Sequence, residues 1–148
     1  MAKPGPMDHL RELAEKKLND TAIRLGSAQQ SFVQETSRLE QLHTYAHEYR
    51  QQLQDSVRTR SVSILSLQTQ QNFLASLDGV VAQQVRRVSV SQHKVDSEKD
   101  AWKQDKRRLN AFQTLKDRAD EQQLLKENRL EQKMMDEFAR RAASQRQL

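Results

Sequence analysis

The chain has 148 residues, of which 35% are hydrophobic and 30% are charged, with three glycines, two prolines and no cysteine. A globular domain of many elements needs more apolar residues for its core and more turn formers, so this composition favours a few long helices that expose most of their circumference. The lack of cysteine excludes disulfides, thiolate metal sites and cysteine nucleophiles, and it fits a reducing compartment.

Membrane insertion and secretion find no support in the sequence. No apolar run approaches the roughly 20 residues that a transmembrane helix needs. The N-terminal residues 1–6 carry one positive charge with no apolar stretch behind it, which is unlike a secretory signal. We therefore expect a soluble, cytoplasmic protein.

The net charge of +5 belongs to the second half of the chain. Residues 1–85 hold nine Lys/Arg and nine Asp/Glu, so the whole excess lies in residues 86–148. The basic residues there are interspersed with acidic ones, which is typical of a solvated helix face, although binding to nucleic acid or to an acidic protein surface stays an alternative.

A first helix is predicted over about residues 8–57. The breaker cluster Pro4-Gly5-Pro6 precedes it, and Asp8 is a plausible N-cap. Two sets of positions recur every seven residues with one charged interruption, as in a coiled-coil seam. They are Leu18, Leu25, Phe32, Leu39, Ala46 and Leu53, with the companions Ala14, Thr21, Ala28, Glu35, Leu42 and Tyr49.

A second helix is predicted over about residues 68–145 with the same spacing. Its apolar positions are Leu74, Val81, Val88, Val95, Trp102 and Leu109, and its companions are Leu77, Gln84, Ser91, Glu98, Asp105 and Phe112. Because the companions are mostly polar, the seam is expected to be one-sided. After Phe112 the phase slips, and Leu130, Met134 and Phe138 form a new stripe.

Residues 58–67 are the predicted turn, because the segment around them is rich in Ser, Thr and β-branched residues, which form helices less readily. Without Gly or Pro there, one continuous helix remains the alternative. A reversal near residue 62 makes residues 1–148 a single all-α domain, a long two-helix antiparallel coiled-coil hairpin with arms of ~70 Å. Leu18 and Leu25 would then face Leu109 and Trp102.

The hairpin leaves a C-terminal helical overhang, about residues 115–148, without an intramolecular partner. Isolated helices are marginally stable in water, so this segment is expected to be loosely ordered until a partner covers it.

Neither catalysis nor metal binding has a visible apparatus. His43 and His47 share a helix face at a spacing that suits two metal ligands, but no third ligand completes a site. No Walker loop, dinucleotide fingerprint or nucleophile elbow is present. We therefore expect no enzyme activity, cofactor, metal or small-molecule substrate.

An apolar group beside the second seam has two interpretations. Phe73, Leu77 and Val80 widen the apolar face beyond what two helices require. The group is either a docking surface or simple packing against the end of the first helix, where Tyr45, Tyr49 and Leu53 lie.

Four stretches carry a resemblance to a known family. The closest are residues 101–118, with AWK and RRLNAFQTLKDR, and residues 127–139, ENRLEQKMMDEFA; weaker ones are residues 10–16 and 45–50. With these stretches the chain resembles the FliJ family of flagellar type III export proteins over its whole length.

The resemblance implies a stalk-like component of the flagellar export apparatus, required for flagellum biogenesis and motility. Its implied partners are the hexameric export ATPase, whose activity it promotes, the membrane export gate protein, and export chaperones that it cycles. It would be cytoplasmic and peripheral at the inner membrane at the flagellar base, held through these partners, with no nucleic acid bound. The alternatives are the stalk of a virulence-type injectisome and a general structural coiled-coil scaffold.

The resemblance also implies two sets of site residues. The gate-binding set is Phe73, Leu77, Val80 and Gln84, in which Val80 and Gln84 depart from the small residue and histidine of the best-known relatives. The ATPase-binding set comprises Arg118, Arg129, Leu130, Lys133, Met134 and Phe138.

Overall fold

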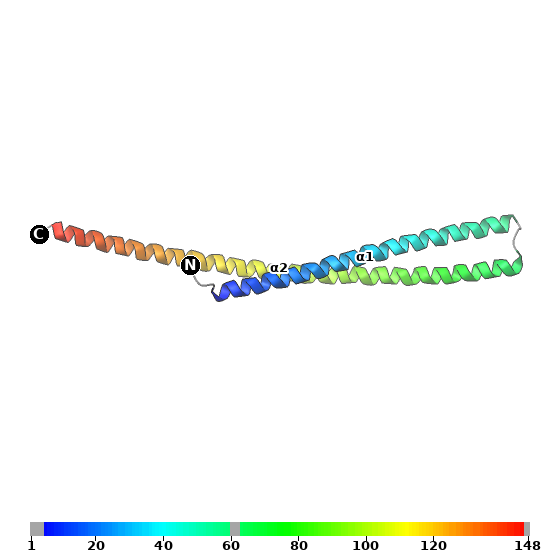
Figure 1. Cartoon of the computed structure of the whole chain (residues 1–148), viewed down its shortest axis with the longest axis horizontal. Helices are drawn as coiled ribbons and strands as arrows, with labels where there is room; N and C mark the ends of the chain where they lie inside the picture. The colour runs from blue at the N-terminus through cyan, green and yellow to red at the C-terminus, as the bar shows by residue number, and fades with distance from the viewer. Residues whose placement is uncertain (1–4, 60–62, 147–148) are drawn as a thin grey trace. The chain divides into compact units, whose positions relative to one another are not determined.

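Two α-helices hold nearly all of residues 5–59 and 63–146, the part of the chain that the computed structural model describes. α1 is Pro6–Arg58 and α2 is Ile64–Arg146, and these described residues include no strand (Figure 1). The helices pack against each other as an antiparallel hairpin, which confirms the predicted all-α fold. They form two compact units, one of Met1–Leu18 with Gln104–Leu148 and one of Asn19–Lys103.

α1 begins with a cap that the sequence pattern assigned to the wrong residue. The Gly5 amide donates to Asp8 Oδ2 at 3.0 Å, and the Asp8 amide donates to the Gly5 carbonyl at 3.1 Å. Gly5 is therefore the N-cap, Pro6 takes the first helical position, where its missing N–H costs nothing, and Asp8 reaches back from the third. The prediction that Asp8 is the N-cap is wrong, because the helix already begins at Pro6, two residues before Asp8.

Asp8 also ties the two helices together in the first unit. Its Oδ1 lies 2.9 Å from Lys116 Nζ, and this hydrogen bond, helped by the Gly5 amide, holds the pKa of the Asp8 carboxyl below its ordinary value. A second ion pair joins Lys17 and Asp105 at 3.8 Å. The start of α1 is thus held against α2 by polar contacts as well as by the seam.

α2 starts four residues before the predicted position. Ser63 Oγ accepts a hydrogen bond from the Ser66 amide at 3.2 Å, and the Ser63 carbonyl accepts one from Leu67 at 2.9 Å. Ser63 therefore caps α2, and the helices extend into both sides of the turn predicted for residues 58–67. Residues 60–62 of that turn lie outside the described residues.

The predicted heptad positions are the ones that the hairpin covers. Every one of the twelve positions assigned to each helix is buried or half-buried. The polar companions on α2 are included, with Gln84 and Asp105 among the most buried residues, so the expectation of a one-sided seam is wrong. At Gln84, Glu98 and Asp105, hydrogen bonds or ion pairs to α1 take the place of apolar contact. Ser91 Oγ instead donates to the Val88 carbonyl of α2 itself at 2.8 Å.

The pairing of the helices differs from the predicted one by about one helical turn. In the unit of residues 19–103, Arg24 Nε lies 3.2 Å from Glu98 Oε2, whereas the predicted register set Leu25 against Trp102. In the other unit, Lys17 meets Asp105, whereas Leu18 was expected to face Leu109. Heptad spacing repeats along each helix and does not say which layer of one helix meets which layer of the other.

Beyond Lys116, α2 has no cover from its own chain in the unit that contains it. Every residue from Asp117 to Arg141 is exposed, yet the helix continues to Arg146. Side-chain contacts four residues apart support it, including Gln123 to Glu127 and Arg141 to Glu137. That this overhang exchanges its amide protons quickly in the free protein stays a prediction.

The first prediction concerns register. Because the chain has no cysteine, engineered pairs can be compared directly. The pair Leu25→Cys with Glu98→Cys is expected to oxidise to a disulfide faster than Leu25→Cys with Trp102→Cys, since four residues move a side chain by about 6 Å along the helix. Electrophoresis under non-reducing conditions measures the rates, and the opposite order would contradict the register.

The second prediction concerns the buried polar layer formed by Gln84, whose Nε2 donates to the Glu35 carbonyl at 2.9 Å and to its carboxylate. Gln84→Leu is expected to lower the free energy of unfolding by about 1–3 kcal/mol, because it leaves Glu35 without that donor. The double variant Glu35→Leu/Gln84→Leu is expected to recover most of the loss. Urea denaturation of wild type, both single variants and the double variant tests the coupling.

Candidate functional site

The predicted gate-binding residues fall into two classes on α2. Phe73 and Val80 are 45% and 47% exposed, whereas Leu77 and Gln84 are 7% and 6% exposed. Leu77 and Gln84 occupy seam positions, so their side chains face α1 and are not available to a partner in the folded hairpin. The structure thus brings the four residues onto one stretch of α2 but exposes only two of the side chains.

Phe73 packs against α1 on one side and is exposed to a partner on the other. Its ring lies 4.9 Å from that of Tyr49, measured between centroids, at an interplanar angle of 55°. This tilted contact holds Phe73 beside the seam while nearly half of its surface stays open. The packing interpretation therefore holds for Leu77 and for one side of Phe73, and the exposed remainder is a surface that a partner can reach.

The predicted ATPase-binding residues lie on the uncovered part of α2. All six are exposed, and Phe138 reaches 76%. Arg118, Arg129 and Lys133 fall on one stripe of the helix, because steps of eleven and four residues return to nearly the same direction. Leu130, Met134 and Phe138 form the neighbouring stripe. A basic edge beside an apolar one is an arrangement that another protein surface can cover.

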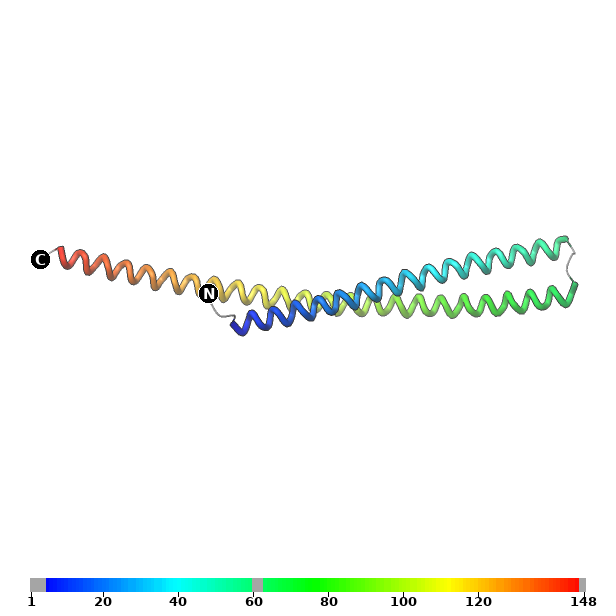
Figure 2. Tube along the Cα trace, in the orientation of Figure 1, coloured from blue at the N-terminus to red at the C-terminus, as the bar shows by residue number. Residues whose placement is uncertain are grey.

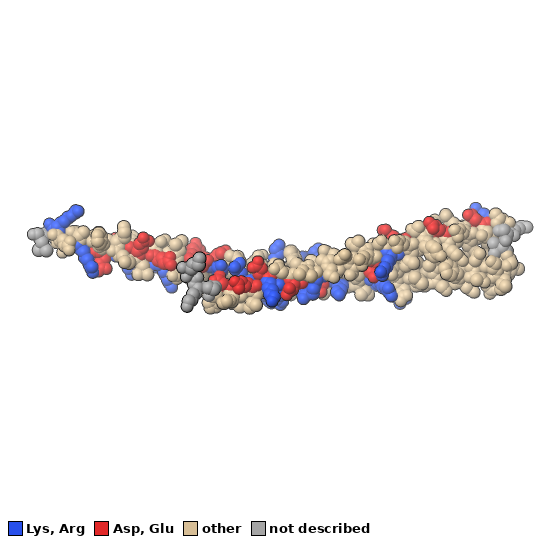
Figure 3. Space-filling view, viewed as in Figure 1, with Lys and Arg blue, Asp and Glu red and all other residues tan. Residues whose placement is uncertain are grey.

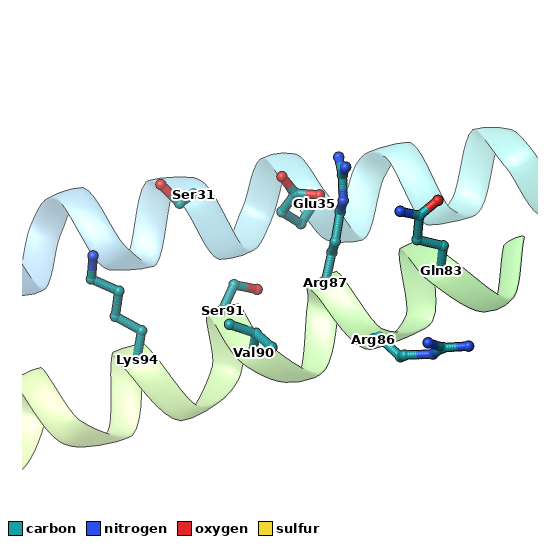
Figure 4. A pocket seen from close by; sticks show the side chains of 8 residues that line it. All are labelled: Ser31, Glu35, Gln83, Arg86, Arg87, Val90, Ser91 and Lys94. Carbon is teal, nitrogen blue, oxygen red and sulfur yellow. The ribbon is translucent and has the colours of Figure 1, made fainter. Parts of the chain in front are cut away.

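Between the helices of residues 19–103 lies an open groove of about 460 Å³ (Figure 4). Its walls combine Ser31 and Glu35 of α1 with basic and polar side chains of α2, namely Gln83, Arg86, Arg87, Val90, Ser91 and Lys94. Arg87 and Lys94 rise toward α1 in Figure 4, and Arg86 points away from it. A smaller groove of about 400 Å³ adjoins it, and Arg87 lines both.

Charge is unevenly spread over this unit. On the face shown in Figure 3, α2 is free of Lys, Arg, Asp and Glu near the turn, whereas α1 carries charged residues at the same end. Residues 61–77 contain no charged side chain, and Ile64 and Leu65 are well exposed there. The start of α2 therefore exposes apolar side chains in a segment that carries no charge of its own, while Asp55 and Arg58 at the end of α1 are charged and exposed.

The candidate metal pair does not develop into a site. His43 and His47 are both exposed, and residues 5–59 and 63–146 hold no group of three or more His, Cys, Asp or Glu arranged around a common point. In those same ranges neither helix has a segment apolar and long enough to cross a bilayer.

Sequence reasoning missed two features of these surfaces. Gln84 and Glu35 were both assigned to the seam, but their direct pairing depends on the register between the helices. Figure 2 shows the parts of α1 and α2 in residues 19–103 side by side, without their side chains. The basic groove was overlooked because the basic residues were weighed together with acidic neighbours further along the chain. A count restricted to residues 79–95, which contain Arg86, Arg87 and Lys94 but no Asp or Glu, would have revealed it.

Comparison with known proteins points to one family. The family model described as "Flagellar FliJ protein" matches residues 3–148. The chain is 38% identical over 143 residues to the flagellar FliJ protein of Escherichia coli K12, which covers 97% of each chain. The flagellar FliJ protein of Salmonella typhi matches with the same identity and the same coverage of both chains.

These matches span both helices, including the overhang of α2. Both relatives and the family model carry the name flagellar FliJ protein. The family match covers residues 3–148, and the 38% identity extends over 97% of both chains. The chain belongs to the flagellar FliJ protein family.

Proposed function

We propose that this protein is the stalk of the flagellar protein export apparatus, which joins the export ATPase to the membrane export gate and cycles export chaperones. The overhang of α2 enters the pore of the hexameric ATPase and promotes its activity. The turn-proximal face of α2 contacts the gate protein. The protein works on the cytoplasmic side and is held peripherally at the inner membrane, at the flagellar base, through these partners.

The observation that carries the proposal is the uncovered helix from Asp117 to Arg141. Its apolar stripe of Leu130, Met134 and Phe138 has no cover in its own unit, and full burial of such a side chain is worth about 1.5–3 kcal/mol each. A ring that surrounds the helix would bury the stripe. It would also offer acidic partners to Arg118, Arg129 and Lys133. Membership of the flagellar family favours this assembly over an injectisome stalk or a structural scaffold.

The gate contact rests on Phe73 and Val80 as the side chains that touch the partner. Leu77 and Gln84 act through the hairpin, because they hold this stretch of α2 against α1. Substitution of Leu77 or Gln84 therefore changes how firmly this part of α2 is held against α1, and it leaves the exposed side chains that touch the partner unchanged. This division supports a contact that depends on an intact hairpin.

The decisive test of the ATPase contact uses the full chain with the cognate export ATPase. Phe138→Asp is expected to raise the concentration needed for half-maximal stimulation of ATP hydrolysis at least about tenfold, since a buried aromatic contact is lost and a charge must be desolvated. Leu13→Asp is the matched control, because Leu13 is also exposed in the same unit but on α1. Unchanged stimulation by Phe138→Asp would overturn the pore contact.

Hydrogen exchange provides a second readout of the same contact. Amides of residues 117–146 are expected to exchange quickly in the free protein, because a single helix gains little stability by itself. Addition of the ATPase is expected to slow them, while amides near Leu77 in the seam stay slow in both states. Strong protection of the overhang in the free monomer would contradict this mechanism.

The gate contact generates a separate prediction. Val80→Asp is expected to weaken binding to the cytoplasmic part of the gate protein at least about tenfold without lowering the urea midpoint, because Val80 is exposed. Leu77→Ala is expected to lower the free energy of unfolding by about 2–5 kcal/mol, since it removes a buried side chain.

Ile23→Asp serves as the control for Val80→Asp, because Ile23 is an exposed apolar residue of α1 in the same unit. Binding is measured by isothermal calorimetry, and stability by urea denaturation followed by circular dichroism. If Val80→Asp and Ile23→Asp bind alike, the gate contact lies elsewhere.

A further inference from the structure

A basic stripe continues directly from the apolar gate-binding surface along α2. Phe73, Val80, Arg87 and Lys94 are each seven residues apart, so they share one edge of the helix beside the seam. Val80 and Arg87 are therefore separated by about 10 Å along the helix axis, and Phe73 and Lys94 by about 30 Å. One edge is thus apolar near the turn and basic further from it.

The cations of this stripe lack the ion pairs that neutralise comparable residues. Within residues 5–59 and 63–146, the structure has no carboxylate at salt-bridge distance from Arg86, Arg87 or Lys94. In the same unit, Arg50 lies 2.7 Å from Asp78 and Arg24 lies 3.2 Å from Glu98. These two interhelical ion pairs lie on either side of Arg87 and Lys94 along α2, and among the described residues these two cations have no such pair.

Glu35 does not neutralise the groove into which the stripe leads. It is the one acidic residue among those that line this groove. Its carboxylate already receives a hydrogen bond from Gln84, and its other oxygen lies 3.6 Å from Arg38. Arg38 lines the adjoining groove with Arg87, so α1 adds a further cation to the site. The local balance is therefore positive even with Glu35 counted.

We propose that this edge of α2 recognises a segment of the gate protein in which apolar residues are followed by acidic ones. The apolar part covers Phe73 and Val80, and carboxylates about 10–20 Å further along enter the groove and pair with Arg87 and Lys94. The inference rests on the proposed gate contact and adds the chemistry of the partner. The apolar part supplies most of the binding free energy, and the charged part steers the encounter and fixes the direction of the segment.

A protein partner fits this surface better than a nucleic acid. Phosphate backbones are met by an extended row of cations, and single strands also need aromatic platforms. Here the stripe ends at Lys94, because the position seven residues further on is Ala101, and Asp96 and Glu98 follow on the same helix. Phe73 is already in contact with Tyr49, and Tyr45, which lines the adjoining groove with Arg87, is a single ring and not a row of platforms. A surface that is half apolar and half basic matches an amphipathic acidic segment.

The test measures association of the full chain with the purified cytoplasmic part of the cognate gate protein by surface plasmon resonance, at low and high salt. Arg87→Glu/Lys94→Glu is expected to reduce the association rate at low salt at least about tenfold and to flatten its salt dependence. The control Lys99→Glu/Lys103→Glu makes the same change in net charge in the same unit and is expected to stay within about threefold of wild type.

Two further variants make the outcomes distinguishable. Arg87→Gln/Lys94→Gln removes charge without reversing it and is expected to lie between wild type and the double glutamate variant, with an unchanged urea midpoint. Val80→Asp reports the apolar contact alone. If Val80→Asp weakens binding while the double glutamate variant matches its control, the acidic-segment inference is overturned and the gate contact stands.

If neither Val80→Asp nor the double glutamate variant weakens binding, the gate contact itself is wrong and this inference falls with it. A 20-nucleotide single-stranded RNA serves as the competing probe. Tight binding of this RNA that Arg87→Glu/Lys94→Glu abolishes, together with unchanged gate binding by that variant, would assign the stripe to nucleic acid and overturn the inference.

Discussion

Packing of one narrow seam between two helices is the constraint on which the rest of this protein depends. The buried apolar residues number only four among the described residues, and three of them are alanines. Such a seam allows close approach of the helices but gains less from burial than a core of larger side chains. Each helix therefore keeps most of its circumference exposed, and the protein presents long surfaces that other molecules can cover.

Polar contacts determine the register between α1 and α2, because the small apolar side chains of the seam fit several registers. The contact of Gln84 with Glu35, and the ion pairs Arg24–Glu98 and Lys17–Asp105, each join positions that only one register brings together. Shifting one helix by a turn would leave buried or half-buried polar groups without partners, which costs more than the apolar contacts would regain. The same polar positions thus explain why a seam poor in large apolar residues still has one register.

The two proposed partners bind different kinds of surface: the gate protein binds a helix that packs against another helix, and the ATPase binds a helix that is exposed on all sides. Near the turn, Phe73 and Val80 stay open beside a seam that holds their helix in place. Arg87 and Lys94, which have no ion pair among the described residues, extend that surface. In the other unit, all residues from 117 to 141 of α2 are exposed. A partner at the first surface meets a helix supported by a second helix, whereas a partner at the overhang must itself supply the support.

The sequence by itself determined the helices, their heptad faces and the uncovered end, because composition and seven-residue spacing depend only on local helix geometry. It also carried the family resemblance in residues 101–118 and 127–139. Only the tertiary structure decided the register, since identical spacing on both helices permits several alignments. It also decided that Leu77 and Gln84 face inward while Phe73 and Val80 face outward, and which cations find a carboxylate across the seam. These outcomes depend on which layers of the two helices meet, and no single helix contains that information.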